Sequence, residues 1–517
     1  MSNRLVDATD DYRINALLSG AKWGAEEAGS ATEVSYSFPA GLAYWKYSTE
    51  VDAGWYGLTS TQRPSFTDAL QLWADVATIS FTAISDGITY GDLRIGYSYA
   101  VPDENSAYAY LPGGGKVEAD GTITPNEQNG DIWLHPSLTD FSPGGQGAYT
   151  LLHEIGHAIG LKHSFESDAQ FPAMPVLQDN TAYTIMSYTD SKAAGYNFTP
   201  QANNTYSAQV IKPTTPMLYD ILAIQHLYGV NTETRSGDDT YTFATRGELM
   251  TIWDGGGADT IDLSNQQVAT KLNLTAGSFS SVGQRQMMFA ADLEAAEDNI
   301  AIAYDVEIEN AIGTRFNDEI KGNALDNTLT GGAGNDLLNG GEGEDTAVFA
   351  GNSSDYVFRS SGDNISVEGV DGLDQLISIE QLKFDDESLA TSDLLLINGD
   401  PVEAVPTNKS EVNHTPVEGK TAYFLLEMST ALTRSASVSY TTRDGTAVAG
   451  EDYVATSGTA TLQPGQTFIA IPVELLDDGI TEANEYFQLA ISNPSEGVFA
   501  DDQVELVAQR IIVDNDA

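Results

Sequence analysis

Apolar and polar residues follow three different patterns along the 517-residue chain. Over residues 1–235 helical and strand-like periods are mixed, which predicts an α+β domain. Over residues 236–392 short apolar pairs are separated by Gly, Asp and Asn, which predicts short strands joined by turns. Beyond about residue 410 apolar and polar residues alternate between turns, for example over 436–440 and 468–473, and this alternation predicts a small antiparallel β-sandwich.

These patterns predict a multidomain chain, in agreement with its length. The predicted parts are an α+β domain over residues 1–235, a repeat domain over 236–398 and a β-sandwich over 411–517. Residues 399–410 are predicted to form a linker, because this stretch and its surroundings are rich in proline and glycine.

Residues 147–163 combine an apolar helical face with three histidines. His153 and His157 are four residues apart, so they lie one turn apart on a second face of the predicted helix, where two imidazoles can hold one zinc ion. Gly160 can adopt a positive φ and end the helix, which lets the chain turn and bring His163 to the same ion. The apolar face consists of Leu151, Leu152, Ile155, Ala158 and Ile159.

Glu154 follows the first predicted ligand and can reach a water on the metal without binding the ion itself. Three nitrogen ligands leave a coordination position open, as in a catalytic zinc site, where zinc lowers the pKa of water to about 7. Glu154 is therefore predicted to be the general base that accepts a proton from the attacking water and passes it to the leaving amine.

A nine-residue period runs from residue 313 to residue 349. Glycines recur at Gly313, Gly322, Gly331 and Gly340, acids or amides at Asp318, Asn327, Asp336 and Asp345, and apolar residues at Ile320, Leu329, Leu338 and Ala347. The two fullest units also contain Gly332, Gly334, Gly341 and Gly343. This repeat predicts a calcium-loaded parallel β-roll, with glycine-rich turns and Asp carboxylates around the ions and the apolar residues inside.

A further isolated unit over residues 254–261 predicts calcium ligands at Asp254, Gly257 and Asp259, and residues 237–241 are a partial copy. The alternative, a flexible Gly/Asp-rich linker, is disfavoured because period and apolar phase agree through four turns.

The composition limits the function further. The chain has 75 acidic and 23 basic residues and a net charge of −52, which excludes nucleic acid as a partner and suits either a solubilising surface or calcium binding. There is no cysteine, so neither a disulfide nor a thiolate zinc site is possible. No apolar run is long enough to predict a membrane span, and the first residues lack the apolar core of a cleaved signal peptide.

The sequence His-Glu-x-x-His-x-x-Gly-x-x-His resembles the zinc motif of the metzincins. Residues 183–188, Tyr-Thr-Ile-Met-Ser-Tyr, resemble the Met-turn of serralysins and astacins. This resemblance implies that Met186 lies under the zinc ion. It also implies that Tyr188 is an additional zinc ligand that can swing away to stabilise the oxyanion.

Other segments of the first half also resemble serralysins, namely residues 16–24, 36–39, 107–113, 130–133 and 220–229. In metzincins an edge strand above the zinc pairs with extended substrate. The candidate here is Ala107, Tyr108, Ala109 and Tyr110, although a purely structural strand explains these residues equally well. Neither His135 nor His226 is assigned to the metal.

The last ~107 residues resemble a Calx-β domain, in which calcium binds loops at one end of a β-sandwich. The matching candidate ligands are Glu418, Asp452, Asp477, Asp478, Glu482, Glu485, Asp514 and Asp516. The alternative is that these acids are solvated loop residues of a structural domain.

Together, the resemblances imply an α+β metzincin zinc-protease domain, a parallel β-roll of calcium-binding nonapeptide repeats and a Calx-β-like β-sandwich. The expected function is a secreted, monomeric bacterial endopeptidase with one catalytic zinc, several structural calcium ions and protein or peptide substrates. Repeats of this kind also imply export by type I secretion machinery, without a cleaved N-terminal signal. The alternatives are a calcium-dependent adhesin or matrix protein with an inactive protease domain, and an intracellular peptidase, in which the calcium repeats would stay empty.

Overall fold

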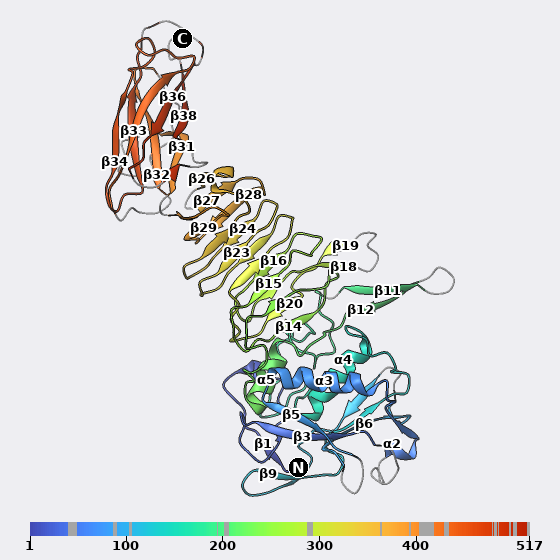
Figure 1. Cartoon of the computed structure of the whole chain (residues 1–517). Coiled ribbons are helices and arrows are strands. Elements are labelled where there is room, and N and C mark those ends of the chain that lie inside the picture. Colours follow the sequence, from blue (N-terminus) through green and yellow to red (C-terminus); the bar gives the residue numbers. More distant parts are fainter. Residues whose placement is uncertain are drawn as a thin grey trace. The chain divides into compact units, whose positions relative to one another are not determined.

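Two units, Met1–Ile308 and Glu309–Ala517, divide the chain in the computed structural model (Figure 1). The structure describes residues 1–39, 49–85, 90–102, 106–193, 195–200, 206–286, 293–361, 364–391, 394–402, 418–428, 434–477, 479, 483, 485–495, 498–499 and 504–513. None of the helices in this described part combines the length and the apolar character needed to cross a membrane.

The N-terminal unit contains a mostly parallel sheet with the strand order β5-β3-β6-β10-β7, and β4 also pairs with β6. Its strands are β3 (Thr32–Ser37), β4 (Trp55–Gly57), β5 (Ile79–Ala83), β6 (Leu93–Ser98), β7 (Ala107–Ala109) and β10 (Asp131–Leu134). All residues of β6 and β10 are buried, as expected for parallel strands covered on both faces. The edge strand β7 pairs antiparallel with β10.

A second, four-stranded sheet has the order β2-β1-β9-β8. It consists of β1 (Asn3–Leu5), β2 (Ala21–Trp23), β8 (Gly115–Val117) and β9 (Thr122–Pro125). The strands β11 (Tyr196–Pro200) and β12 (Tyr206–Val210) form a separate antiparallel pair.

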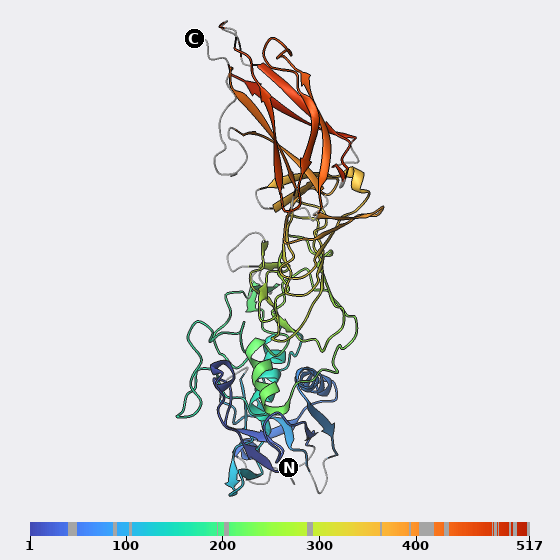
Figure 2. The ribbon, with the colours of Figure 1, turned by 90° about the vertical axis from the view of Figure 1, so that its left-hand side faces the viewer.

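Three helices, α3 (Arg63–Val76), α4 (Gln146–Ala158) and α5 (Leu218–Tyr228), lie together on one side of the mostly parallel sheet, as Figures 1 and 2 show. In α3 the buried residues recur with the helical period and form one apolar face. Helix α4 is buried on nearly all sides, so the histidines it carries are held in a fixed frame. The short helices α1 (Tyr12–Asn15) and α2 (Thr49–Asp52) complete this part.

The same unit ends with short strands. β13 (Thr240–Tyr241) pairs in parallel with β15 (Thr260–Asp262), and β14 (Met250–Ile252) pairs in parallel with β20 (Ile300–Ile302). β20 also pairs antiparallel with β17 (Phe279–Ser280). The remaining strands are β16 (Lys271–Asn273) and the antiparallel pair β18 (Gln284–Gln286) and β19 (Leu293–Ala295).

The C-terminal unit begins with what we call the repeat stack, residues 310–390, in which successive strands alternate between two parallel ladders. One ladder contains β21 (Asn310–Ile312), β23 (Thr328–Thr330), β25 (Thr346–Val348) and β29 (Gln381–Lys383), followed by the antiparallel β30 (Ser388–Ala390). The other contains β22 (Glu319–Lys321), β24 (Leu337–Asn339) and β28 (Leu373–Ile377). The predicted inward residues Ile320, Leu329, Leu338 and Ala347 are all fully buried, which confirms the apolar phase of the repeat.

The second ladder continues from β28 into the antiparallel strands β27 (Asn364–Glu368) and β26 (Val357–Ser361). A 3₁₀ turn, η1 (Ser353–Asp355), precedes β26. Residues 349–368 therefore leave the parallel ladder before β28 rejoins it.

Two four-stranded sheets follow the repeat stack. One contains β31 (Leu394–Val402), β32 (Thr421–Met428), β35 (Phe468–Glu474) and β37 (Val498–Phe499), and the other contains β33 (Ala436–Asp444), β34 (Ser457–Leu462), β36 (Glu485–Ser492) and β38 (Glu505–Ile512). Side chains of both sheets share one buried core, where Phe487 contacts Phe424 edge-on and stacks on Tyr453.

The predicted linker is wrong at its start. Strand β31 extends to Val402 and pairs with β32, so residues 399–402 belong to a sheet rather than to a linker. The strand also begins before residue 399, inside the predicted repeat domain. Gly399 and Pro401 suggested a break, but the irregular register between β31 and β32 at residues 398–402 accommodates them in the strand. Residues 403–410 lie outside the described residues.

Candidate metal centre

The Nδ1 atom of each predicted zinc ligand lies within hydrogen-bond distance of an oxygen atom. His153 Nδ1 lies 2.7 Å from the Ile185 carbonyl oxygen, and His157 Nδ1 lies 2.8 Å from the Leu161 carbonyl oxygen. His163 Nδ1 lies 2.9 Å from a carboxylate oxygen of Glu166. Carbonyl and carboxylate oxygens only accept hydrogen bonds, so each Nδ1 carries the proton and each Nε2 keeps its lone pair.

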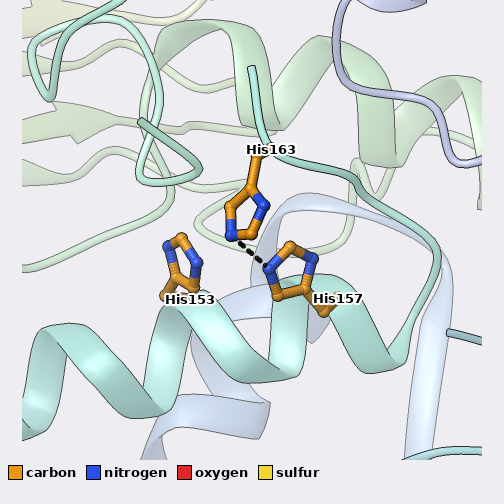
Figure 3. A group of neighbouring side chains, drawn as sticks. All are labelled: His153, His157 and His163. Atoms are coloured by element: carbon orange, nitrogen blue, oxygen red, sulfur yellow. Dashed lines mark hydrogen bonds between the residues drawn. The ribbon is translucent and has the colours of Figure 1, made fainter. Parts of the chain in front are cut away.

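The three rings converge, as Figure 3 shows: His153 and His157 rise from one face of α4 and His163 reaches down from the segment that follows it. One ring nitrogen from each histidine can be chosen so that all lie within 4.8 Å of one another, and Nε2 of His157 is 3.0 Å from Nε2 of His163. Two nitrogens that both carry lone pairs repel at this distance unless a cation lies between them. Zinc bound at 2.0–2.1 Å would hold such nitrogens about 3.3 Å apart, so the donor set fits this ion.

The environment keeps two of the imidazoles neutral. Burial lowers the pKa of His153 to about 4, and burial together with the neighbouring histidines lowers the pKa of His157 well below its usual value. Neutral imidazole is the form that binds a metal ion.

Glu154 places a buried acid beside these ligands. Its side chain is 4% exposed, and its Oε2 atom has no hydrogen-bond partner within the described part of the chain. Burial raises the pKa of this carboxyl to about 8. Buried polar atoms are normally satisfied, so this atom indicates a position for a water or substrate group next to the metal.

Tyr188 closes the group on its solvent side. Its hydroxyl is 2.7 Å from His163 Nε2, and its ring stacks on that of His153 with 5.7 Å between centroids. The residue is 67% exposed, so the site is open to solvent. The hydroxyl therefore lies where it can contact either the metal or a group bound to it.

The turn under the histidines is fixed from two directions. Met186 is fully buried, and a Cβ added to Gly156, which stands between the two helical ligands, would lie only 2.8 Å from the Met186 Sδ. Asp220, the first residue of the segment 220–229, accepts hydrogen bonds from Thr184 Oγ1 at 2.6 Å and from the Ile185 amide at 2.8 Å. This contact supports the peptide that holds His153, a role that no pattern around Asp220 predicts.

Gly160 has φ +119°, as its place after the helix predicts, and α4 ends at Ala158. A Cβ at this position would lie 2.6 Å from the Ala21 carbonyl oxygen. The turn therefore needs glycine both for its backbone conformation and for its close approach to β2.

The predicted substrate strand coincides with β7 and lies against α4. Tyr110 and Ser106 hydrogen-bond through their backbones to the chain around β10. By alternation, the amide and carbonyl groups of Ala107 and Ala109 face away from β10, toward the free edge of the sheet. The hydroxyls of Tyr108 and Tyr110 both contact Glu50, at 2.5 and 2.9 Å.

The two histidines left unassigned lie elsewhere. His135 contacts Ser137 Oγ at 2.7 Å, and His226 is half-buried on α5. Within the described residues, neither belongs to a group of potential metal ligands.

A second group of potential ligands consists of Asp239, Asp254 and Asp259, whose carboxylate oxygens lie within 4.8 Å of one another. Asp254 and Asp259 are buried, and a Cβ at the predicted Gly257 would lie 2.2 Å from the Gly237 carbonyl oxygen. The partial copy at residues 237–241 therefore contributes a third acid, Asp239, which the sequence analysis did not name as a ligand.

The acids of the nonapeptide repeats form a regular ladder. Asp336 and Asp345 each accept a hydrogen bond, at 2.8 Å, from the backbone amide 18 residues earlier. Both side chains are at most 2% exposed, and burial raises the pKa of each to about 6. Each keeps one buried oxygen with no partner among the described residues. Glycines with positive φ form the turns beside them, namely Gly332, Gly334, Gly341 and Gly343.

The remaining predicted repeat ligands lie in the same repeat stack. Asp318 and Asn327 are buried, and Asn327 occupies the acidic position with its amide. The glycines Gly313, Gly322, Gly331 and Gly340 leave no room for a side chain, because an added Cβ would lie 2.1 to 2.3 Å from a neighbouring oxygen.

The Calx-β candidates are described only in part. Asp452 accepts a hydrogen bond from the Val448 amide at 2.7 Å, and Asp477 lies beside Gly419. With Glu418 and Glu485 they do not form a group of three potential ligands within the described residues. The other four candidates, Asp478, Glu482, Asp514 and Asp516, lie outside the described residues.

Comparisons with known families cover most of the chain. Residues 56–195 match the Matrixin family, residues 148–244 the Met-zincin family and residues 219–416 the Peptidase M10 serralysin C-terminal family. Residues 408–516 match the Calx-beta domain. The zinc motif and the Met-turn both lie inside the Matrixin match.

Similar proteins include the serralysin of Proteus mirabilis, 33% identical over 333 residues, which are 58% of this chain and 61% of that protein. The metalloprotease AprA of Pseudomonas entomophila is 32% identical over 346 residues, covering 62% of this chain and 65% of that protein. The chain thus spans less than two thirds of these relatives. A solved Calx CBD1 domain is 33% identical and covers 20% of this chain and 91% of that domain, with a TM-score of 0.18.

Proposed function

We propose that this chain, which is similar to the serralysin-type metzincins and carries a C-terminal Calx-beta domain, is a zinc-dependent endopeptidase. One observation carries the proposal. Three histidine rings, each with its Nδ1 proton engaged, converge next to a buried carboxylate oxygen that has no partner in the described residues.

His153, His157 and His163 would hold the zinc ion, with Tyr188 as an additional contact. When bound, zinc supplies a Lewis acid that polarises the scissile carbonyl and lowers the pKa of water to about 7. Glu154 accepts a proton from the attacking water and later returns it to the leaving amine. The solvent-exposed Tyr188 hydroxyl donates a hydrogen bond to the oxygen that becomes negatively charged.

Strand β7 would bind the substrate in an extended conformation. The outward amide and carbonyl groups of Ala107 and Ala109 can pair with a peptide backbone at the edge of the sheet, close to α4. Backbone pairing tolerates many side chains, which suits an enzyme that acts on varied protein substrates. The carboxylate of Glu50 accepts hydrogen bonds from the hydroxyls of Tyr108 and Tyr110 and so orients the two tyrosine side chains of this segment.

Substitution of Tyr188 by Phe should lower kcat by about 10²-fold, the usual cost of losing one donor to an oxyanion. KM should change little, because the ring and its stacking on His153 remain. Steady-state kinetics on a fluorogenic peptide give both constants. An unchanged kcat would rule out the oxyanion role.

The function itself is tested by casein hydrolysis. The purified chain should cleave casein, lose the activity with 1,10-phenanthroline and regain it when zinc is added back. An adhesin with an inactive protease domain would show no cleavage under any of these conditions. That alternative is disfavoured because such a relic could lose Glu154 without penalty, yet the acid is present beside all three histidines.

The repeats are proposed to bind structural calcium. In this proposal the domain of residues 1–235 performs catalysis, the repeats up to about residue 393 form a calcium-loaded β-roll, and the sheets from β31 onward form the Calx-β sandwich. Calcium-dependent folding suits a protein that is exported unfolded, through type I secretion machinery, into a calcium-rich extracellular space. The acidic surface suits the same destination.

A further inference from the structure

One turn of the repeat stack is absent from the nine-residue period of the sequence. Residues 369–377, Gly-Val-Asp-Gly-Leu-Asp-Gln-Leu-Ile, keep glycine at the first and fourth positions, Asp at the sixth and an apolar residue at the eighth. They follow the last regular repeat only after a 20-residue segment, 349–368, part of which forms β26 and β27. The strand of this unit, β28, pairs in parallel with β24 and places Leu376 opposite Leu338 inside the stack.

The contacts of a regular repeat recur here. Asp336 accepts from the Asp318 amide at 2.8 Å across 18 residues, and Asp374 accepts from the Asp336 amide at 2.7 Å across 38 residues. Asn335 likewise accepts from the Leu373 amide at 3.0 Å, just as its own amide donates to Asn317. The inserted segment therefore increases the separation in sequence between the two turns, but the hydrogen bonds between them are those of a regular repeat.

The fourth position of the turn also has the backbone conformation of a regular repeat, whereas the second position, Val370, lacks the positive φ of Gly332 and Gly341. Gly372 has φ +146°, close to the +139° of Gly334 in the unit below it. A Cβ at Gly372 would lie 1.5 Å from the Gly334 carbonyl oxygen, so the two turns are in direct contact.

Two carboxylate oxygens at this junction have no partner within the described residues. Asp336 is 2% exposed and its Oδ2 atom is unpaired. Asp371 is fixed by the Tyr356 hydroxyl, which donates to its Oδ2 atom at 2.7 Å, while its buried Oδ1 atom is unpaired. Asp374, also 2% exposed, accepts a hydrogen bond from the Asp336 amide. The ligand oxygens of the three acids do not all lie within 4.8 Å of one another in the described structure, so an ion here would also draw on the turn carbonyls.

The opposite ladder ends differently. There Glu380 accepts from the Asp345 amide at 2.8 Å and so takes the place of the repeat aspartate. However, only Ser378 and Ile379 separate it from the end of β28, so the Gly-rich turn is missing. This ladder therefore keeps the acidic cap and one nearby carbonyl oxygen, that of Ser378 beside Gly340, but it lacks the glycine-rich loop that supplies further carbonyl ligands in a regular repeat.

We infer that the turn 369–374 and the turn 331–336 together form one further calcium site, with Asp336, Asp371 and Asp374 as its acids, and that Glu380 closes the other ladder without binding an ion. This inference rests on the proposal that the repeats bind calcium. Hard carboxylate and carbonyl oxygens held by glycine turns are the ligands that calcium prefers.

The test is a count of bound calcium by equilibrium dialysis of the full chain at saturating free calcium. Asp371→Asn keeps the acceptor for Tyr356 but removes the charge, and it should bind one calcium fewer than the wild type. Glu380→Gln removes one charge from the other cap and should bind the wild-type number. An unchanged count in Asp371→Asn, or a loss of one ion in Glu380→Gln, would overturn the inference.

Anomalous diffraction from calcium-soaked crystals of the wild type gives a second readout that needs no variant. A calcium peak between Asp336 and Asp371 is expected, and density elsewhere in the stack without one there would overturn the inference. If the wild type bound no calcium at all, the proposed role of the repeats would fail with it, so the two failures are distinguishable.

Discussion

Glu154→Gln should reduce kcat by about 10³-fold or more while the zinc content stays at one per chain. Glutamine has the same shape but cannot accept the proton of the attacking water, and general-base catalysis contributes about 10²–10⁴-fold. The acid follows His153 on α4 but its Oε2 atom has no hydrogen-bond partner in the described residues, so the change should leave the ligands in place. Single-turnover kinetics and metal analysis of the same sample measure both quantities.

Glu166→Gln is the matched control. Its carboxylate contacts His163 Nδ1 at 2.9 Å, and a glutamine oxygen can accept the same hydrogen bond. This variant should lose less than about tenfold of kcat, because a neutral acceptor still orients the ring. If both variants lost kcat equally, the loss would reflect negative charge near the histidines rather than a proton acceptor at position 154.

Removal of calcium with EGTA should unfold the repeat stack. Each site contributes about 2.7 kcal/mol when free calcium is 100 times its Kd, so several sites together are comparable to the whole stability of an ordinary domain. Without the ions, buried acids such as Asp336 and Asp345 are left with unpaired oxygens and with other acids nearby. Far-UV circular dichroism and limited proteolysis should show loss of β structure between residues 309 and 390.

A pair of variants separates calcium binding from net charge. Asp345→Asn should raise the calcium concentration needed for folding, because this buried acid would lose its charge. Glu342→Gln removes one charge from the same turn, but its side chain is exposed, and it should behave as the wild type. If the wild-type stack had the same midpoint of denaturation in EGTA as in calcium, the calcium proposal would be contradicted.

The zinc motif could be recognised from the sequence because its members lie on one helix and the turn after it. The spacing of His153 and His157 and the glycine at position 160 determine the local geometry almost alone. The inward positions of the repeats could also be predicted from the sequence, since a fixed nine-residue period places the eighth residue of each unit inside.

Features that depend on contacts between distant segments were not accessible. Asp220 supports the turn at Thr184 and Ile185 from 35 residues away or more, and nothing in its own surroundings indicates this. The last rung of the repeat stack was missed because the inserted segment interrupts the nine-residue period. Part of strand β31 is predicted to be a linker because its local turn signals carry no information on the pairing with β32 that overrides them.

The most direct test of the account is anomalous diffraction at the zinc edge from crystals of the purified chain. A single peak is predicted, bound by the Nε2 atoms of His153, His157 and His163 at about 2.0–2.1 Å, together with one zinc per chain by metal analysis. A chain that purifies folded but binds no zinc, or that binds zinc away from these rings, would contradict the central claim.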